Sequence, residues 1–227
     1  MHIEPGVVVG AKAMLGYATA ATVMGYTAKL AADVIRKDGV SALLMRSLIA
    51  TVIVFCSFEV FPHYPVGVSE VHLILGTTLF LMFGAVPAAV GLSLGLLVQG
   101  LFFAPADLPQ YGMNVTSLLV PLFGVNALAR RIIPERTAYK DIEYSHCLAL
   151  STAYQGGVVA WVAFWAFYGQ GFGAANLLQV GQFGVAYLAV IAVEPLVDLA
   201  VLAGVKGLHW LGDSGVFHAR LYRAAAE

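Results

Sequence analysis

Met1-His2-Ile3-Glu4-Pro5-Gly6 opens the chain, and these six residues organise the interpretation of the rest. Met1 and His2 together offer a metal ion three nitrogens: the terminal amine, the His2 amide once it is deprotonated, and the His2 ring. No basic region is followed by an apolar core and a small-residue cleavage site, so we expect no removable leader. We also expect Met1 to be retained, because methionine removal usually requires a small second residue. A terminal Met-His pair has no significance in most proteins, so its meaning depends on the remaining sequence.

The composition is that of an integral membrane protein. Of 227 residues, 60% are hydrophobic and only 11% are charged, with a mean hydropathy of +0.84. Soluble domains carry about a quarter charged residues. The apolar runs are continuous rather than alternating, which predicts transmembrane helices and not a β-barrel. The net charge of −1 leaves no basic face for nucleic acid.

Seven apolar stretches approach the length that a transmembrane helix needs, which is about 20 residues. They lie at 7–32, 42–61, 71–86, 88–103, 115–133, 148–168 and 178–205. The third and fourth are short and separated only by Gly84-Ala85-Val86-Pro87, so this pair can alternatively form one re-entrant hairpin. The sequence predicts an all-α, polytopic membrane helix bundle of about seven transmembrane helices, within a range of six to eight. We expect residues 1–227 to form a single transmembrane domain.

The basic residues predict how the bundle is oriented, since cytoplasmic loops are rich in Lys and Arg. Eleven of the twelve cluster beside alternate connections and after the last span. They are Lys29, Arg36, Lys37, Arg46, Arg130, Arg131, Arg136, Lys140, Lys206, Arg220 and Arg223. Only Lys12 lies on the other side. We therefore expect an external N-terminus and a cytoplasmic C-terminus.

Histidines and oxygen acceptors collect on the side predicted to be external. His2, His63 and His72 fall there, whereas Lys12 is the only cation. The accompanying acceptors are Glu4, Glu59, Glu70, Asp107, Gln110, Tyr111 and Asn114. A face with imidazoles and carboxylates but a single cationic side chain suits the uptake of a positive ion.

Two external loops carry the candidate residues for such a site. In the first, Ser69 and Glu70 precede His72, which stands at the mouth of an apolar span, where an unpartnered imidazole is costly and therefore a functional candidate. In the second, Gln110 and Asn114 are candidates to orient a ligand imidazole through a hydrogen bond. His63 lies in Phe61-Pro62-His63-Tyr64-Pro65, where we expect an exposed loop residue, and it is the reserve ligand.

These motifs, in this order, resemble those of the CbiM/NikM family: Met1-His2-Ile3-x-x-Gly6, Ser69-x-x-His72-Leu73 and Gly112-x-Asn114. Members of that family are the substrate-binding (S) components, or permeases, of energy-coupling factor ABC importers for cobalt and nickel. The resemblance implies that the N-terminus inserts into the bundle and that Met1, His2 and His72 bind Co²⁺ or Ni²⁺. It also implies a bacterial plasma (inner) membrane location. This chain departs from the family at Glu70, where a small or neutral residue is usual, and at Thr116-Ser117, where a second Asn is common.

The ligand set agrees with coordination chemistry. Three nitrogens from Met1-His2 and one from His72 make a square-planar N4 site, a geometry that favours Ni(II) or Cu(II), whereas octahedral Co(II) needs additional axial ligands.

Other subunits would have to supply the energy for uptake. The sequence has no Gly-x-x-x-x-Gly-Lys-Ser/Thr motif, so we expect no P-loop in this chain. A transmembrane coupling subunit and ATPase subunits would then be partners. Ala21, Gly25, Ala28 and Ala32 recur at helical spacing and offer a docking face for such a subunit, although small residues can equally pack within the bundle. Gly91 and Gly95 form a similar pair in the fourth span.

Two further classes of function stay open. A family member could serve as a structural subunit of a larger membrane complex. An intramembrane metalloenzyme would need a general base, for which Glu4 and Glu70 are the external options, but no His-Glu-x-x-His motif is present. We therefore expect a transport component and not an enzyme. In the last span, Glu194 and Asp198 share one helix face. Proton coupling stays open for this pair, but no Lys or Arg within the spans is expected to partner them, so we expect interior hydrogen bonds or a subunit contact.

Overall fold

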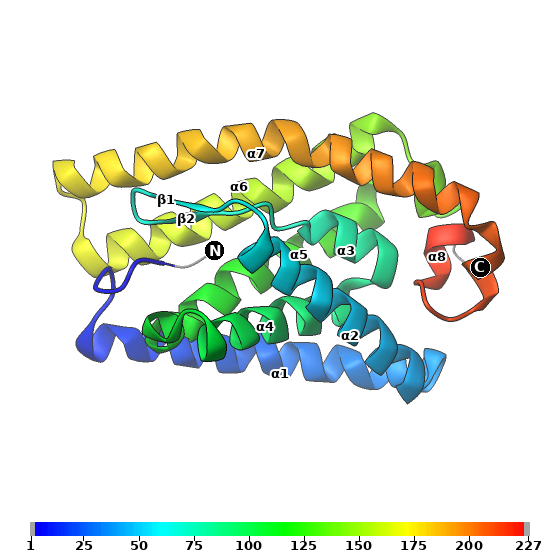
Figure 1. The fold of residues 1–227 in the computed structure, drawn as a ribbon, viewed down its shortest axis with the longest axis horizontal. Helices are drawn as coiled ribbons and strands as arrows, with labels where there is room; N and C mark the ends of the chain where they lie inside the picture. The colour runs from blue at the N-terminus through cyan, green and yellow to red at the C-terminus, as the bar shows by residue number, and fades with distance from the viewer. Residues whose placement is uncertain (1–2, 225–227) are drawn as a thin grey trace.

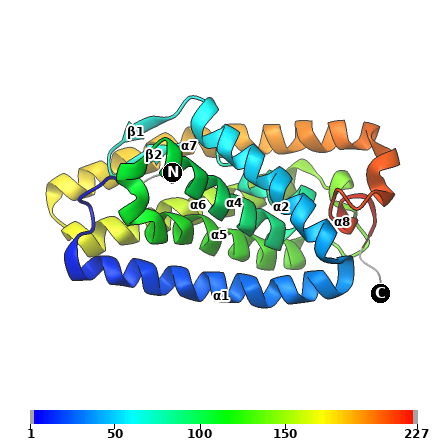
Figure 2. The ribbon, with the colours of Figure 1, turned by 60° about the horizontal axis from the view of Figure 1, so that its bottom comes forward.

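A computed structural model describes residues 3–224 and confirms a helical bundle (Figure 1). The long helices are α1 (Ala13–Asp38), α2 (Val40–Phe55), α4 (Ala85–Phe102), α5 (Tyr111–Ile132), α6 (Tyr144–Gln170) and α7 (Ala174–Gly207). The short helices are α3 (Gly76–Phe83) and α8 (Ala219–Tyr222). One antiparallel hairpin pairs β1 (Tyr64–Val66) with β2 (Ser69–Val71). In Figures 1 and 2, α1 and α7 run along opposite edges of the bundle, and α5 lies between them.

Five helical segments in the described part of the chain are long and apolar enough to cross a membrane. They are Val40–Val60, Ala85–Phe102, Pro105–Ile132, Tyr144–Gln170 and Ala174–Gly207. The helix α1 has sufficient length, at 26 residues, but charged residues gather in its last ten positions. The predicted spans at 42–61, 88–103, 115–133, 148–168 and 178–205 therefore correspond to observed helices.

The prediction of a helical span over 71–86 is wrong. The eight residues of α3 and the first two of α4 are helical there, with a break at Gly84, and a helix as long as α3 is about 12 Å long, far short of the bilayer core. Residues 67–84 still cross the bundle. The turn at Gly67 contacts Gln179 near the start of α7, and Gly84 contacts His218 near the C-terminus. This third pass therefore consists of β2, the extended residues 72–75 and α3. Non-helical backbone at membrane depth is tolerated because protein, and not lipid, surrounds it.

Small residues bring α2 and α4 into close contact. A Cβ added at Gly91 would lie 2.4 Å from Ala50 Cβ, and one added at Gly95 would lie 2.5 Å from Val54 Cγ1. Any larger side chain would force these helices apart. Gly91 and Gly95 thus pack inside the bundle and do not form a docking face.

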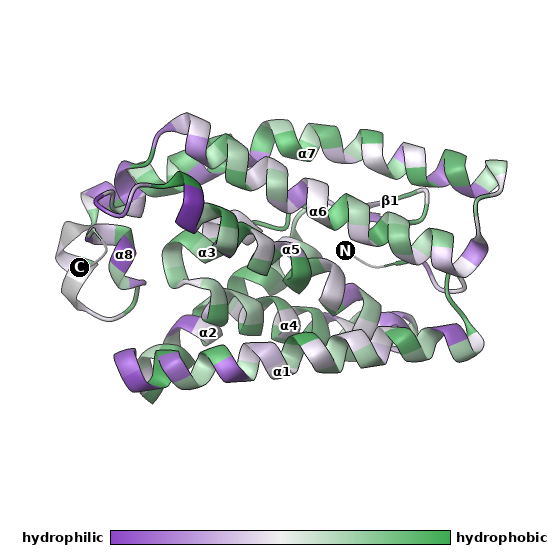
Figure 3. Cartoon of the chain, turned by 180° about the vertical axis from the view of Figure 1, so that it is seen from behind, coloured by the Kyte–Doolittle hydropathy of each residue, from purple (hydrophilic) through white to green (hydrophobic). Residues whose placement is uncertain are grey.

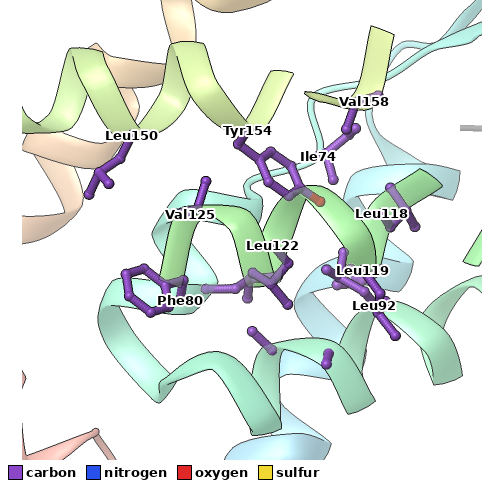
Figure 4. Packing of buried hydrophobic residues seen from close by; sticks show 14 of the residues in the cluster. Ile74, Phe80, Leu92, Leu118, Leu119, Leu122, Val125, Leu150, Tyr154 and Val158 are labelled. Carbon is purple, nitrogen blue, oxygen red and sulfur yellow. The ribbon is translucent and has the colours of Figure 1, made fainter. Parts of the chain in front are cut away.

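The core lies where α3, α4, α5 and α6 meet. Figure 4 shows Tyr154 of α6 reaching towards α5, beside Ile74 of the extended segment and above Leu122. Tyr154, Ile74 and Leu122 are all completely buried. A Cβ on Gly76 would lie 2.2 Å from the Tyr154 ring, so the glycine at the start of α3 makes room for this side chain. The third pass is consequently fixed from α6 as well as from its own neighbours in the sequence.

Polar residues gather at the two ends of the bundle. In Figure 3, the hydrophilic colour is concentrated at the end that carries α8, and the central parts of the helices are mainly hydrophobic. Arg46 binds the carbonyl of Gly215 at 2.9 Å, and Arg220 binds that of Pro134 at 3.1 Å, so basic residues from α2 and the C-terminal segment meet at this end. At the opposite end, Lys12 donates to the carbonyls of Tyr168 and Gly169. This separation fits the orientation predicted from the basic residues.

Cysteine labelling of intact cells tests that orientation. Cysteine at Ala106, an exposed position before α5, is expected to react with a membrane-impermeant maleimide added outside. Cysteine at Glu135, exposed between α5 and α6, is expected to react only after permeabilisation. Both variants should carry Cys56→Ser, because Cys56 is partly accessible. The reverse labelling pattern would contradict an external N-terminus.

Candidate metal centre

The described N-terminal residues enter the bundle and are held there by backbone contacts. Ile3 is completely buried, and its N–H donates to Oδ1 of Asn114 on α5 at 2.9 Å. Ile3 also forms an antiparallel bridge with Ser69 of β2, and the Glu4 N–H donates to the Val68 carbonyl at 3.2 Å. A short β-type pairing therefore attaches the N-terminal segment to the hairpin.

A tight turn places the hairpin against α7. Val66 and Ser69 close a two-residue loop whose first residue, Gly67, has φ +63°. Glycine is favoured at that position because L-residues rarely adopt positive φ. A Cβ there would also lie 2.0 Å from the Gln179 carbonyl oxygen. The hairpin is thus seated on α7 and presents β2 to the N-terminal segment.

His72 follows β2 directly and is enclosed by aromatic and acidic side chains. It is 1% exposed, and its Nε2 lies 3.0 Å from Oε2 of Glu70. The Phe58 ring lies on one side, with ring centroids 5.1 Å apart. Glu70, a candidate from the same loop, therefore contacts the predicted ligand itself.

His63 is closer to the site than expected. It lies in a loop, as predicted, and its ring stacks on the His72 ring with centroids 5.1 Å apart and planes 19° apart, which was not predicted. The residue is partly buried. Its Nδ1 lies 3.1 Å from the Phe61 carbonyl oxygen, which assigns the proton to Nδ1 and leaves the Nε2 lone pair as its possible donor to a metal.

Two of the other candidates, Ser69 and Asn114, contact the backbone of the N-terminal segment. Ser69 is completely buried and pairs with Ile3, and Asn114 binds the Ile3 N–H. The contact of Asn114 with Ile3 positions the N-terminal chain; its role in orienting a ligand imidazole stays a prediction. Gln110, 7% exposed, ends the 3-10 turn before α5, and its Oε1 has no hydrogen-bond partner within residues 3–224.

Met1 and His2, the other predicted ligands, lie outside the described residues. Within residues 3–224, no group of three His, Cys, Asp or Glu side chains is arranged to hold a metal ion. The described part of the site therefore contributes His72, its Glu70 and His63 neighbours, and the scaffold that fixes Ile3. The aromatic wall made by Phe58 was not predicted, since a phenylalanine in an apolar helix carries no local signal of a site.

The predicted docking positions lie on the outer face of α1. Ala21, Gly25, Ala28 and Ala32 are all exposed, and no atom lies within 4 Å of where a Gly25 Cβ would be. In this chain they do not pack against another described helix. Glu194 and Asp198 point inward, as expected for interior hydrogen bonding, and are 0% and 1% exposed.

Comparison with known proteins places this geometry in a family. The family model CbiM, described as a cobalt uptake substrate-specific transmembrane region, matches residues 2–210. A solved structure described as a transition metal transporter has the same fold, with a TM-score of 0.68 over 92% of this chain and 94% of that one, at 19% sequence identity. The comparison with curated proteins gave no match.

Proposed function

This chain belongs to the CbiM family of cobalt uptake substrate-specific transmembrane regions, and from that premise we propose that it is the substrate-binding component of an energy-coupling factor importer. Its substrate in this proposal is a divalent transition metal, Co²⁺ or Ni²⁺. The ion is captured from the external side of a bacterial plasma membrane. Met1 and His2 supply three nitrogens, and His72 supplies the fourth.

The direction of the Ile3–Ser69 bridge is the observation that carries this proposal. Because the pairing is antiparallel, the step from Glu4 to Ile3 runs along β2 from Val68 towards His72. Consecutive Cα atoms are about 3.8 Å apart, so a ligand set that includes Met1 and His2 requires Ile3 to be held close to His72. Asn114 holds the Ile3 N–H at 2.9 Å, which fixes the point from which the two residues extend. An N-terminus anchored in this way supports a site shared with His72.

Glu70 supports His72 as a ligand. A carboxylate that accepts a hydrogen bond from one imidazole nitrogen fixes the tautomer and raises the basicity of the other nitrogen. In the described structure Glu70 lies at Nε2, so in this proposal Nδ1 is the nitrogen of His72 that binds the metal. The family usually has a neutral residue at this position, so Glu70 is a local feature of this chain.

Binding of the metal by the purified protein is the direct test. Full-length protein in detergent, treated with chelator and then titrated with Ni²⁺ or Co²⁺, should bind one ion per chain by calorimetry and elemental analysis. Spectra then separate the two metals, because square-planar Ni(II) and octahedral Co(II) differ in their absorption bands. Protein that retains neither metal would favour the structural-subunit alternative and contradict the proposal.

The outer face of α1 supports partnership with a transmembrane coupling subunit, with separate ATPase subunits. Small side chains let helix backbones approach closely, which drives helix association where lipid tails offer no hydrophobic gain. The stripe Ala21, Gly25, Ala28 and Ala32 is exposed along about three turns of α1. It is therefore available to a helix of another chain.

A leucine in this stripe should weaken subunit association without affecting the metal. We expect Gly25→Leu to lower co-purification of the coupling subunit at least about fivefold, because the side chain would stand between the two backbones. Gly124→Leu is the matched control, since Gly124 on α5 is also an exposed helical glycine with no atom within 4 Å of its Cβ position. Equal co-purification of both variants would exclude the stripe as the docking face.

A further inference from the structure

Two carboxylates are buried in α7, the longest helix, which carries none of the candidate transition-metal ligands. Glu194 and Asp198 lie one turn apart on α7 and are 0% and 1% exposed. Neighbouring helices α3 and α6 pack against α7 at this level (Figure 1). Ionised carboxyl groups in such surroundings are costly and commonly mark a functional site.

Side chains from α3 and α6 surround the pair. Ser151 Oγ lies 3.3 Å from Glu194 Oε2, and Gln155 Nε2 donates to the same oxygen. Thr78 Oγ1 donates to Asp198 Oδ1. We refer to Glu194, Asp198, Thr78, Ser151 and Gln155 as the carboxylate cluster.

The carboxylate cluster has more acceptors than donors. Glu194 Oε1, Asp198 Oδ2 and Gln155 Oε1 are buried and have no hydrogen-bond partner within residues 3–224. Gln155 is itself completely buried, and its amide nitrogen binds Glu194, so its oxygen belongs to the same small volume. Tyr154, next to Gln155, also leaves its buried hydroxyl without a partner in this part of the chain.

No positive side chain faces the cluster from the described elements packed on α7. From α6, the Cys147 thiol lies near Asp198 and the Tyr154 phenol lies near Glu194. Tyr187 of α7 lies near Glu194 on the other side, and α3 contributes only hydroxyls. The carboxylate of Glu70 on β2 interacts electrostatically with Tyr187 and not with Glu194 or Asp198.

The basic groups nearest along the chain are occupied elsewhere. Lys140 and Lys206 both pair with Asp141, at 2.7 and 3.4 Å, near the end of α7. They therefore belong to the polar end of the bundle.

Two adjacent negative charges in an apolar interior require a compensating positive charge. We propose that the carboxylate cluster is a second cation site, distinct from the transition-metal centre, that takes one small monovalent cation: a proton or a sodium ion. The oxygens without a hydrogen-bond partner belong to carboxylate and amide groups, and such oxygens are the ligands that hard cations prefer. The cluster has only two carboxylates and no imidazole, fewer strong ligands than a transition-metal site has. Thr78 belongs to α3 and hydrogen-bonds Asp198 of α7. A cation bound in the cluster would therefore hold the third pass against α7.

Thermal unfolding of the metal-free, full-length protein in detergent tests the site. At pH 8 and constant ionic strength, replacing choline chloride by NaCl should raise Tm by about 5 °C once sodium is about 100 times its Kd, if sodium is the ligand. If a proton is the ligand, Tm should ignore sodium and rise as the pH falls, because a buried carboxyl that gains a proton on folding is stabilised at low pH.

Isosteric variants locate the effect. Glu194→Gln and Asp198→Asn keep the shape and hydrogen-bonding capacity but remove the charge, so each should abolish the sodium dependence or flatten the pH dependence. Glu135→Gln, at an exposed loop carboxylate, is the control and should behave as wild type. The proposal fails if wild-type Tm responds to neither sodium nor pH, or if both variants respond exactly as wild type does. It also fails if elemental analysis finds two transition-metal ions per chain and one is lost in Glu194→Gln. None of these measurements depends on Met1 or His2, so their failure is separable from failure of the proposed N-terminal site.

Discussion

A single alanine added before Met1 is expected to abolish transition-metal binding while every side chain remains in place. The added residue converts the Met1 amine into an amide and moves the charged terminus away from the point fixed by Ile3 and Asn114. Loss of hydrogen-bonded partners of metal ligands alone costs about 10–100-fold in affinity. Removing a ligand and breaking the chelate should therefore cost more than about 100-fold, measured by calorimetry with Ni²⁺ and with Co²⁺.

A C-terminal addition provides the control. The same alanine placed after Glu227 changes mass and composition identically but leaves the amine free. The two proteins should have equal helix content by circular dichroism, so that a difference in metal binding reports the site and not the fold. An N-terminally extended protein that binds either ion with unchanged stoichiometry and affinity would remove Met1 from the ligand set.

Replacing His72 by alanine should be as damaging. The imidazole is 1% exposed and is held by Glu70 at 3.0 Å, so its position is fixed before the ion arrives. Binding by wild type should also weaken as pH falls, because the amine, the amide and the imidazoles must all lose protons to coordinate. We expect the affinity of His72→Ala to fall more than about 100-fold, with the pH dependence of the residual binding reduced.

His63→Ala is the sharp comparison, because the two rings stack at 5.1 Å. If His63 only packs against the ligand, its loss should change affinity by less than about tenfold, the order of one ring–ring contact. A loss equal to that of His72→Ala would make His63 a ligand and would require a different coordination geometry.

Sequence reasoning predicted most of the bundle because apolar length is set by bilayer thickness. It failed for 71–86, since apolarity does not distinguish a membrane helix from a buried extended segment. Leu75, in the left-handed region at φ 58°, interrupts the backbone just before α3, and a leucine carries no local signal of such a turn. The sequence also did not show that Gly91 and Gly95 pack against α2, because a glycine does not indicate which helix lies opposite it.

The candidate site was predicted in part. His72 was identifiable because an imidazole at membrane depth needs a partner, and Glu70 is that partner. The stacking of His63 on His72 was not predicted, because flanking prolines indicate a loop but not where the loop folds. The role of Asn114 depended on a contact 111 residues away in the sequence, which only the tertiary structure reveals. The sequence indicates which residue types can bind a metal ion, but it does not give the distances between those residues in the fold.

The third pass has a consequence for biogenesis. As the chain leaves the ribosome, an eight-residue helix preceded by extended backbone offers the insertion machinery no segment that is stable in lipid, where each unpaired peptide group costs several kcal/mol. It gains its shelter from α6 and α7, which are synthesised roughly 60 to 130 residues later. His72 is consequently expected to acquire its final position late, after α7 has been inserted, and a nascent chain that stops at α5 would lack the assembled form of the proposed site.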